Sequence, residues 1–170
     1  MLWLRAAIFS VLVPGAVALY VPWVIGPQSL ASGWWRLGWC LVLAGAAVYL
    51  RCLLSFVASQ GTPAIFFTRQ LRALWGEEPR RLVRSSLYRY SRNPMYGGVI
   101  AVILGQALLR ASWRIALYGA CMFVFFHSIV TLVEEPHLRA RDPQGFDTYC
   151  RATPRWLGIV AARPGDSRRD

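Results

Sequence analysis

Residues 88–109 read YRYSRNPMYGGVIAVILGQALL, a polar, aromatic and cationic cluster followed at once by an apolar run. Pro94 stands where the run begins, and a proline at the first helical position costs nothing because its missing N–H would have no partner there. Gly97 and Gly98 follow in the first turns, where glycine weakens a helix but lets another backbone or a ligand approach closely. The stretch predicts an apolar helix that begins at a polar site.

The composition indicates a membrane protein. Of the 170 residues, 56% are hydrophobic, and the mean hydropathy is +0.39, whereas soluble domains are roughly 45–50% apolar. All 19 basic residues are arginines, and the net charge of +11 taken alone would suit nucleic acid or an anionic membrane surface. Because these arginines flank long apolar runs, we expect membrane lipids as the partner and no nucleic acid.

The four cysteines indicate neither a disulfide framework nor a metal site. They show no CxxC or Cys/His ligand spacing, and three of them lie in apolar runs; they are Cys40, Cys52, Cys121 and Cys150. We therefore expect buried thiols and no bound metal.

The hydropathy pattern predicts an all-α, polytopic protein with four transmembrane helices, over residues 2–25, 34–59, 94–109 and 115–133. At 1.5 Å per residue the third span is only about 24 Å long, so its polar start is expected below the membrane interface. Pro14 should kink the first span. The alternative for that span is a signal peptide, because Ala16-Val17-Ala18 resembles a cleavage site. The apolar run continues to Ile25, so we favour a membrane span.

The distribution of arginine predicts the orientation. Seven of the 19 arginines lie in the polar connection 60–92 and seven more after Glu134. The positive-inside rule places both regions and both termini in the cytoplasm. Within the connection, residues 65–75 are expected to form a short interfacial helix.

The predicted organisation has three parts. These are an N-terminal helix pair (1–59), a core with the transmembrane hairpin 94–133 and cytoplasmic C-terminal helices (60–157), and a disordered basic tail (158–170). The expected location is the bacterial inner membrane, with several spans and an active site that faces the cytoplasm.

Polar residues also gather near the end of the fourth span. His127, Thr131, Glu134 and Leu138 have the spacing i, i+4, i+7 and i+11, which would place them on one helical face. A histidine in an apolar span is either functional or hydrogen-bonded to a neighbouring helix, and both readings stay open.

An acidic pair, Glu134 and Glu135, is expected at the C-terminal end of that span, where the helix dipole disfavours carboxylates and Pro136 interrupts the hydrogen-bond ladder. A bound cation or an arginine from residues 88–98 would compensate; the alternative is a solvated acidic pair.

The hairpin supplies that partner. Arg92 and Asn93 enter one of its helices and the glutamate pair leaves the other, so all four residues are expected to line one pocket on the cytoplasmic side. The alternative for residues 88–98 is a basic and aromatic interface anchor. Arg51, in the second span, either extends to the nearer interface or faces a polar cavity.

These motifs resemble the isoprenylcysteine carboxyl methyltransferase family, and related phospholipid N-methyltransferases share part of the pattern. The resemblance covers roughly residues 60–157. The R-[HN]-P-x-Y-x-G motif and the glutamate pair are specific in combination, although either alone would be weak. The motifs are Gly61-Thr62-Pro63, Arg80 to Val83, Tyr88 to Gly98, His127, Glu134 to Leu138, Phe146 to Cys150 and Pro154-Arg155-Trp156.

The resemblance implies an integral membrane enzyme that uses S-adenosylmethionine. A carboxylate can hold the ammonium and ribose hydroxyls of this cofactor, and an arginine can hold its carboxylate. Carried over by position, the cofactor-binding residues are Tyr88, Arg92, Asn93, Tyr96, Gly98, His127, Glu134 and Glu135. The implied catalytic residues are Arg92, Asn93 and Glu135, and the implied substrate-binding residues are Tyr149 and Arg155.

The expected activity is methyl transfer from S-adenosylmethionine to a lipophilic acceptor, such as the carboxylate of an isoprenylated or lipid-like molecule. The alternatives are N-methylation of a phospholipid ethanolamine and a non-enzymatic membrane scaffold with a degenerate site. Three departures from the family pattern leave the acceptor open: Asn93 in place of a usual histidine, Ser86-Leu87 in place of Gly-Pro, and Asp142-Pro143 in place of Phe-Gly.

Overall fold

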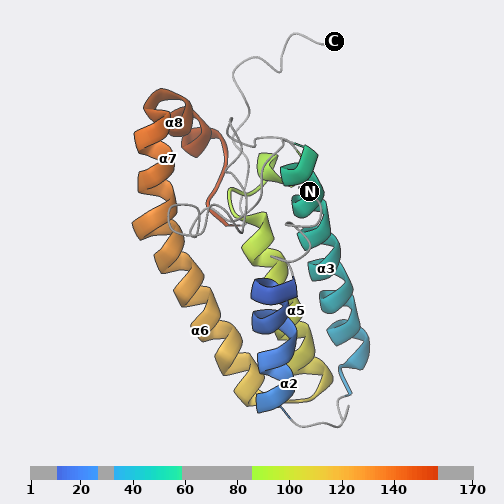
Figure 1. The fold of residues 1–170 in the computed structure, drawn as a ribbon. Coiled ribbons are helices and arrows are strands. Elements are labelled where there is room, and N and C mark those ends of the chain that lie inside the picture. Colours follow the sequence, from blue (N-terminus) through green and yellow to red (C-terminus); the bar gives the residue numbers. More distant parts are fainter. Residues whose placement is uncertain (1–10, 27–32, 59–85, 157–170) are drawn as a thin grey trace, which may run out of the picture.

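The computed structural model describes residues 11–26, 33–58 and 86–156, and every regular element in these ranges is helical (Figure 1). The expected all-α class is thus confirmed. The predicted interfacial helix 65–75 and basic tail 158–170 lie outside the described residues. In chain order the elements are η1 (Val11–Tyr20), α2 (Val21–Ile25), α3 (Trp35–Ala58), η2 (Ser86–Arg89), α5 (Pro94–Leu109), α6 (Trp113–Ile129), η3 (Val130–Glu134), α7 (Glu135–Arg141) and α8 (Pro143–Ala152).

Two of the described helices are long and apolar enough to cross a membrane, Trp35–Ser55 and Trp113–Arg141. Two further apolar helices are shorter, Pro14–Ile25 and Pro94–Leu109. Most side chains of the two long helices are exposed on the chain itself, as expected where a helix faces lipid. The count of four spans and the cytoplasmic orientation stay predictions.

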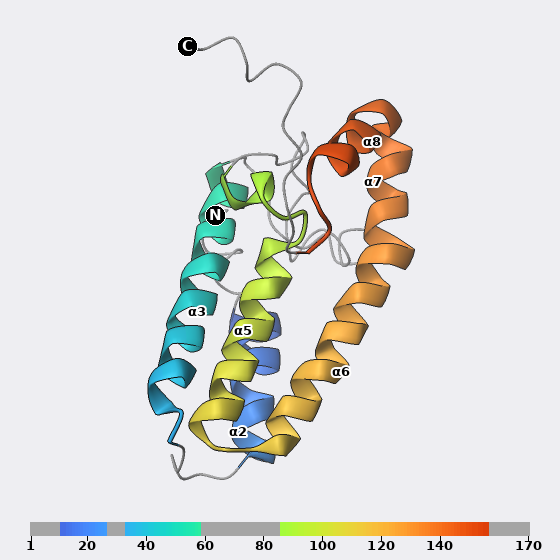
Figure 2. The same ribbon diagram turned by 180° about the vertical axis from the view of Figure 1, so that it is seen from behind.

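Helices α3 and α5 run antiparallel and side by side, with their backbones in close approach (Figure 2). A Cβ atom on Gly45 would lie 2.6 Å from the main-chain oxygen of Gly98, and one on Gly105 would lie 2.7 Å from that of Gly38. Each helix thus contributes two glycines seven residues apart, which is two turns along one face. Small residues allow this approach between membrane helices. We call these four residues the glycine seam.

The glycine seam predicts opposite effects for two neighbouring substitutions. In Gly98→Ala, the new Cβ would lie 2.8 Å from the Gly45 oxygen and 3.1 Å from the Tyr49 nitrogen, both main-chain atoms. We expect a loss of about 1–3 kcal/mol of stability from this overpacking. At Gly97 a Cβ meets nothing within 4 Å, so Gly97→Ala should stabilise by up to about 1 kcal/mol. Thermal unfolding in detergent, followed by helical circular dichroism, measures both; equal stability of the two variants would contradict the seam.

The first helix is joined to α5 through a buried amide. Gln106 is buried within the apolar α5 and donates to the main-chain oxygen of Ala18. This hydrogen bond joins the π-helix η1 to the buried side of α5. Pro14, where we expected a kink, lies within the π-helix η1.

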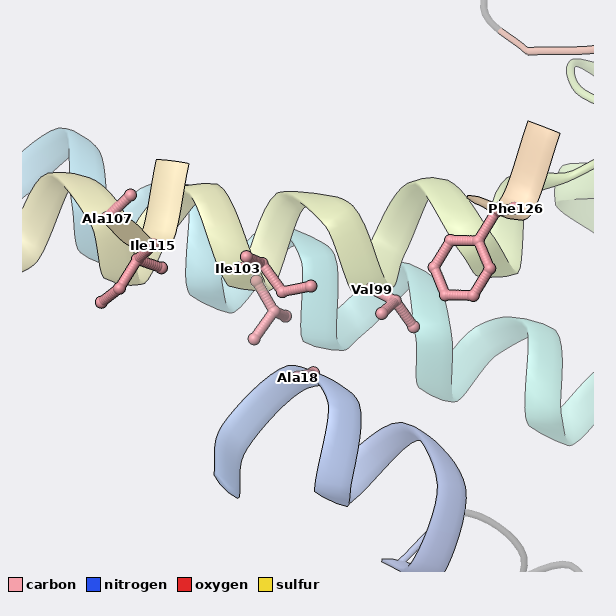
Figure 3. Close-up of a cluster of buried hydrophobic side chains, with 7 residues drawn as sticks. Ala18, Val99, Ile103, Ala107, Ile115 and Phe126 are labelled. Carbon is pink, nitrogen blue, oxygen red and sulfur yellow. The ribbon is translucent and has the colours of Figure 1, made fainter. Parts of the chain in front are cut away.

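The apolar core lies between η1, α5 and α6 (Figure 3). The side chains of Tyr96 and Trp156 also pack against this core. Both belong to motifs singled out in the sequence, so the core supports residues of the expected site. Its buried members are Ala18, Val99, Val102, Ile103, Ala107, Ile115 and Phe126.

The fourth apolar helix does not end at the glutamate pair, which corrects the sequence-based expectation. It continues through α6, η3 and α7 to Arg141. The wider turn η3 accommodates Pro136: the N–H of Glu135 bonds to the carbonyl of Val130, five residues back. Single π-turns of this kind occur frequently at functional sites. Glu134 and Glu135 are therefore not at a helix terminus. The π-turn also holds one residue more than an α-helical turn, so the α-helical spacing of Glu134 and Leu138 from His127 no longer places them on one face.

Candidate functional site

Polar residues meet at one end of the bundle, which we call the polar end. The C-terminal part of α3, the turn η2, the start of α5, and helices α7 and α8 all lie there (Figure 1 and Figure 2). Buried Cys52 of α3 packs against buried Tyr88 of η2. Arg51 is exposed, and its Nε donates to the Ser86 hydroxyl at 3.1 Å. Its guanidinium thus lies at the polar end, and both alternatives for this residue stay open.

Three charged side chains form an ion network at the polar end. Arg92 Nη1 donates to Glu135 Oε1 at 2.8 Å. Arg155 binds the same carboxylate with two parallel bonds, Nε to Oε1 and Nη2 to Oε2, both 2.8 Å. The side chains of Arg92 and Glu135 are 12% and 15% exposed, so these charge-assisted bonds are largely shielded from water. The hydrogen bonds from Arg155 to Glu135 raise the pKa of the Arg155 guanidinium above its usual value.

Helix α8 positions the chain that carries Arg155. Asp142 caps the helix by accepting from the Gly145 N–H at 3.0 Å, and Pro143 stands in its first turn, where no N–H is needed. Phe146 and Tyr149, three residues apart, turn inward and are buried. The Tyr149 hydroxyl donates to the main-chain oxygen of Tyr88 at 2.7 Å, which ties α8 to η2.

After α8 the chain returns across the start of α5. This return segment is Thr153–Trp156. The N–H of Arg92 donates to the Pro154 oxygen at 2.9 Å, and Asn93 Nδ2 donates to the Arg155 oxygen at 3.0 Å. Trp156 Nε1 donates to His127 Nδ1 at 3.1 Å. The return segment therefore joins the start of α5 to α6.

A second polar contact lies beside the ion network. The Tyr96 hydroxyl donates to Glu134 Oε1 at 2.6 Å, and the Tyr96 ring stacks on Phe126 with 4.7 Å between ring centroids. Glu134 is 7% exposed. The two adjacent glutamates thus have different surroundings: Glu135 meets arginines, and Glu134 meets a phenol held by the apolar core.

One N–H donor of Arg92 has no acceptor among the described residues. Its Nη1 also donates to Cys150 Sγ at 2.8 Å, but its Nε is buried and has no hydrogen-bond partner among the described residues. Burial raises the pKa of the Cys150 thiol, which therefore stays protonated at neutral pH. A buried, charged N–H without an acceptor is costly unless a ligand supplies one.

The structure brings most of the sequence-predicted site residues together, in different ways. Arg92, Glu135 and Arg155 bond directly, and Asn93 joins them through the main chain of Arg155. Further pairs form around this network; they are Tyr96 with Glu134, Tyr149 with Tyr88, and His127 with Trp156.

Gly98 is the exception, because it faces the backbone of α3 at Gly45. Its packing against that helix is the role that the structure describes. Its predicted contact with the cofactor stays a prediction.

Sequence reasoning missed the contact of Cys150 with Arg92 and the bond from Trp156 to His127. No sequence signal pointed to the first. It also missed Gly38 and Gly45, although the shared seven-residue spacing in two apolar helices was a usable signal for the glycine seam.

The cysteines differ in part from their expected burial. Cys52 is buried and Cys150 is half-buried, but Cys40 and Cys121 are exposed. The apolar runs that hold these two cysteines turn part of their circumference outward, away from the other described helices. No disulfide and no cluster of metal-ligating side chains occurs among the described residues.

Comparison with known proteins gives one family. The family model of phospholipid methyltransferases matches residues 39–141, which include α5, α6 and both glutamates. No curated protein and no solved structure matches the chain significantly. The resemblance to the isoprenylcysteine carboxyl methyltransferases is supported only at the level of the wider membrane methyltransferase group. Since the match covers more than half of the chain, the protein belongs to the phospholipid methyltransferase family, whose members are membrane methyltransferases for lipid-like substrates.

Proposed function

We propose that this protein transfers a methyl group from S-adenosylmethionine to a lipid at the membrane surface. The observation that carries the proposal is the ion network with its open donor, Arg92 Nε, at the polar end of an apolar hairpin. A site of this kind joins a charged, water-soluble cofactor to an acceptor that stays in the bilayer.

The residues present fit the cofactor. S-adenosylmethionine carries a carboxylate, and Arg92 Nε is a buried cationic donor that lacks an acceptor among the described residues. The cofactor also carries an ammonium and ribose hydroxyls, which suit the carboxylates of Glu134 and Glu135. When bound, it supplies a methyl group on a sulfonium, which an acceptor atom can take by direct displacement.

The protein's own contribution is positioning and exclusion of water. Direct displacement needs no covalent nucleophile on the protein, so rate is gained mainly by holding the reacting atoms in line. The ion network fixes Arg92 from two sides, at Glu135 and Cys150. Tyr96 holds Glu134, and the core ring of Phe126 holds Tyr96. These contacts keep the two carboxylates in place before any ligand arrives.

We propose the amine of a phospholipid headgroup as the acceptor, because the family match is to phospholipid methyltransferases. The carboxylate of an isoprenylated or lipid-like molecule is the second candidate, and it rests on the resemblance described above. The two products differ chemically: an N-methyl amine survives mild base, whereas a methyl ester is hydrolysed.

The test is a labelling experiment on purified protein in vesicles that contain phosphatidylethanolamine and an isoprenylated carboxylic acid. With methyl-labelled S-adenosylmethionine, we expect label on an N-methylated headgroup, which stays non-volatile after base treatment although base removes the acyl chains. If base releases the label as methanol, the product is a methyl ester, and the acceptor is the carboxylate and not the amine. If the protein binds S-adenosylhomocysteine but labels no lipid, both acceptors are rejected. If it also fails to bind S-adenosylhomocysteine, a scaffold with a degenerate site is favoured.

A further inference from the structure

The contacts at the polar end form a closed path. Arg92 bonds to Glu135, and Glu135 bonds to Arg155. The carbonyls of Pro154 and Arg155 then accept from the Arg92 N–H and from Asn93 Nδ2. Asn93 is the uncharged side chain in this path, and it is buried. We infer that Asn93 is a positioning residue, which acts on the cofactor site through Arg155 and does not bind the cofactor itself. This inference rests on the proposed function.

Arg155 needs such an anchor because it does not lie on a regular element. Helix α8 ends at Ala152, and the Arg155 side chain is 34% exposed. A long arginine side chain loses rotamer entropy when it is fixed, so its bidentate bond to Glu135 depends on a backbone that is already in place.

The start of α5 supplies that backbone anchor. The Pro154 carbonyl and the Arg155 carbonyl stand on either side of the Arg155 Cα atom. The Arg92 N–H binds the first at 2.9 Å, and Asn93 Nδ2 binds the second at 3.0 Å. The Ser91 hydroxyl also donates to the second carbonyl, at a longer 3.4 Å. Residues 91–93 thus hold the backbone on both sides of the Arg155 Cα atom. Of the two bonds to the Arg155 carbonyl, the one from Asn93 is the shorter.

The chemistry of this contact requires a donor at position 93. A main-chain carbonyl only accepts hydrogen bonds, and the asparagine amide offers N–H groups of suitable length. Leucine has a similar size but no donor, and aspartate has the same shape but presents acceptors. Histidine can donate a ring N–H, so it could make the same contact.

The inference is tested by a double-mutant cycle on affinity for S-adenosylhomocysteine, measured by calorimetry in detergent. The variants are Asn93→Leu, Arg155→Leu and the combination of both. We expect Asn93→Leu, which loses one neutral hydrogen bond, to weaken binding up to about tenfold. Arg155→Leu loses two charge-assisted bonds to Glu135 and should weaken binding at least as much. The affinity of the combined variant should be no lower than that of the weaker-binding single variant, because both changes remove the support that Arg155 gives to Glu135. Thr148→Ala, which removes only a local bond to Gln144 on the exposed side of α8, serves as the control and should bind like wild type.

Asn93→His should bind within about threefold of wild type, since it restores a donor. Asn93→Asp should bind as weakly as Asn93→Leu, and it provides the test if the leucine variant does not fold. Losses that multiply in the combined variant would show that Asn93 acts independently of Arg155 and would overturn the inference, as would wild-type affinity in Asn93→Asp. A wild-type protein that fails to bind S-adenosylhomocysteine would instead reject the proposed function on which the inference rests.

Discussion

Glu135→Gln is expected to weaken binding of S-adenosylhomocysteine by roughly 10- to 100-fold. Glu135 accepts three bonds of 2.8 Å from two arginines. Glutamine keeps the size of the side chain but removes the charge, and one charge-assisted bond is worth about 1.5–3 kcal/mol. Each 1.4 kcal/mol corresponds to a factor of ten in affinity. The change would also leave Arg92 and Arg155 close together without the anion between them, so Arg92 would lose its fixed position.

The control for this prediction is Asp147→Asn, which removes another carboxylate at the polar end. Asp147 is paired with Arg139 at 3.0 Å, but both side chains are more than half exposed. Exposed pairs contribute about 0–1 kcal/mol. Calorimetric titration should therefore give wild-type affinity for Asp147→Asn and weakened affinity for Glu135→Gln. Equal affinity of the two variants would show that the buried network does not shape the cofactor site.

Arg92→Lys is expected to reduce methyl transfer to the lipid more than 100-fold, although the charge is kept. Arg92 uses Nη1 to hold Glu135 and Cys150, and its buried Nε has no hydrogen-bond partner among the described residues. Lysine has a single nitrogen on a flexible stem and cannot reproduce donors at two separate positions. Loss of two charge-assisted bonds of about 1.5–3 kcal/mol each accounts for an effect of this size.

Initial rates with labelled S-adenosylmethionine, at saturating lipid, measure this effect. The matched control is Arg139→Lys, because Arg139 makes one exposed ion pair, with Asp147, and should stay near the wild-type rate. A rate for Arg92→Lys within a few-fold of wild type would mean that only the charge at this position matters, and the proposed role of Nε would be wrong.

The sequence predicted the apolar helices well where composition changes sharply. The predicted range 94–109 equals α5, because Pro94 begins the apolar run and Arg110 follows its end. The helix of the fourth span was predicted to end near Glu134, and this was wrong, because the π-turn η3 carries the helix past Pro136. A proline marks a helix boundary only when no wider turn relieves it, and the local sequence does not show whether one will form.

The candidate site could be predicted in part from hairpin geometry. An antiparallel hairpin brings its outer ends together, so Arg92 and Glu135 were expected to meet, and they do. The place of Arg155 depends on how the chain returns after α8, which no periodicity in the sequence describes. Arg155 was therefore named as a site residue only through the family resemblance, and Cys150 was not named as a site residue.

The most direct test of the central claim is calorimetric titration of the purified, detergent-solubilised wild-type chain with S-adenosylhomocysteine. We predict saturable binding with one ligand per chain, because Arg92 Nε is the one buried side-chain donor without a hydrogen-bond partner among the described residues. Absence of saturable binding by protein whose helical circular dichroism and thermal unfolding show it to be folded would contradict the account.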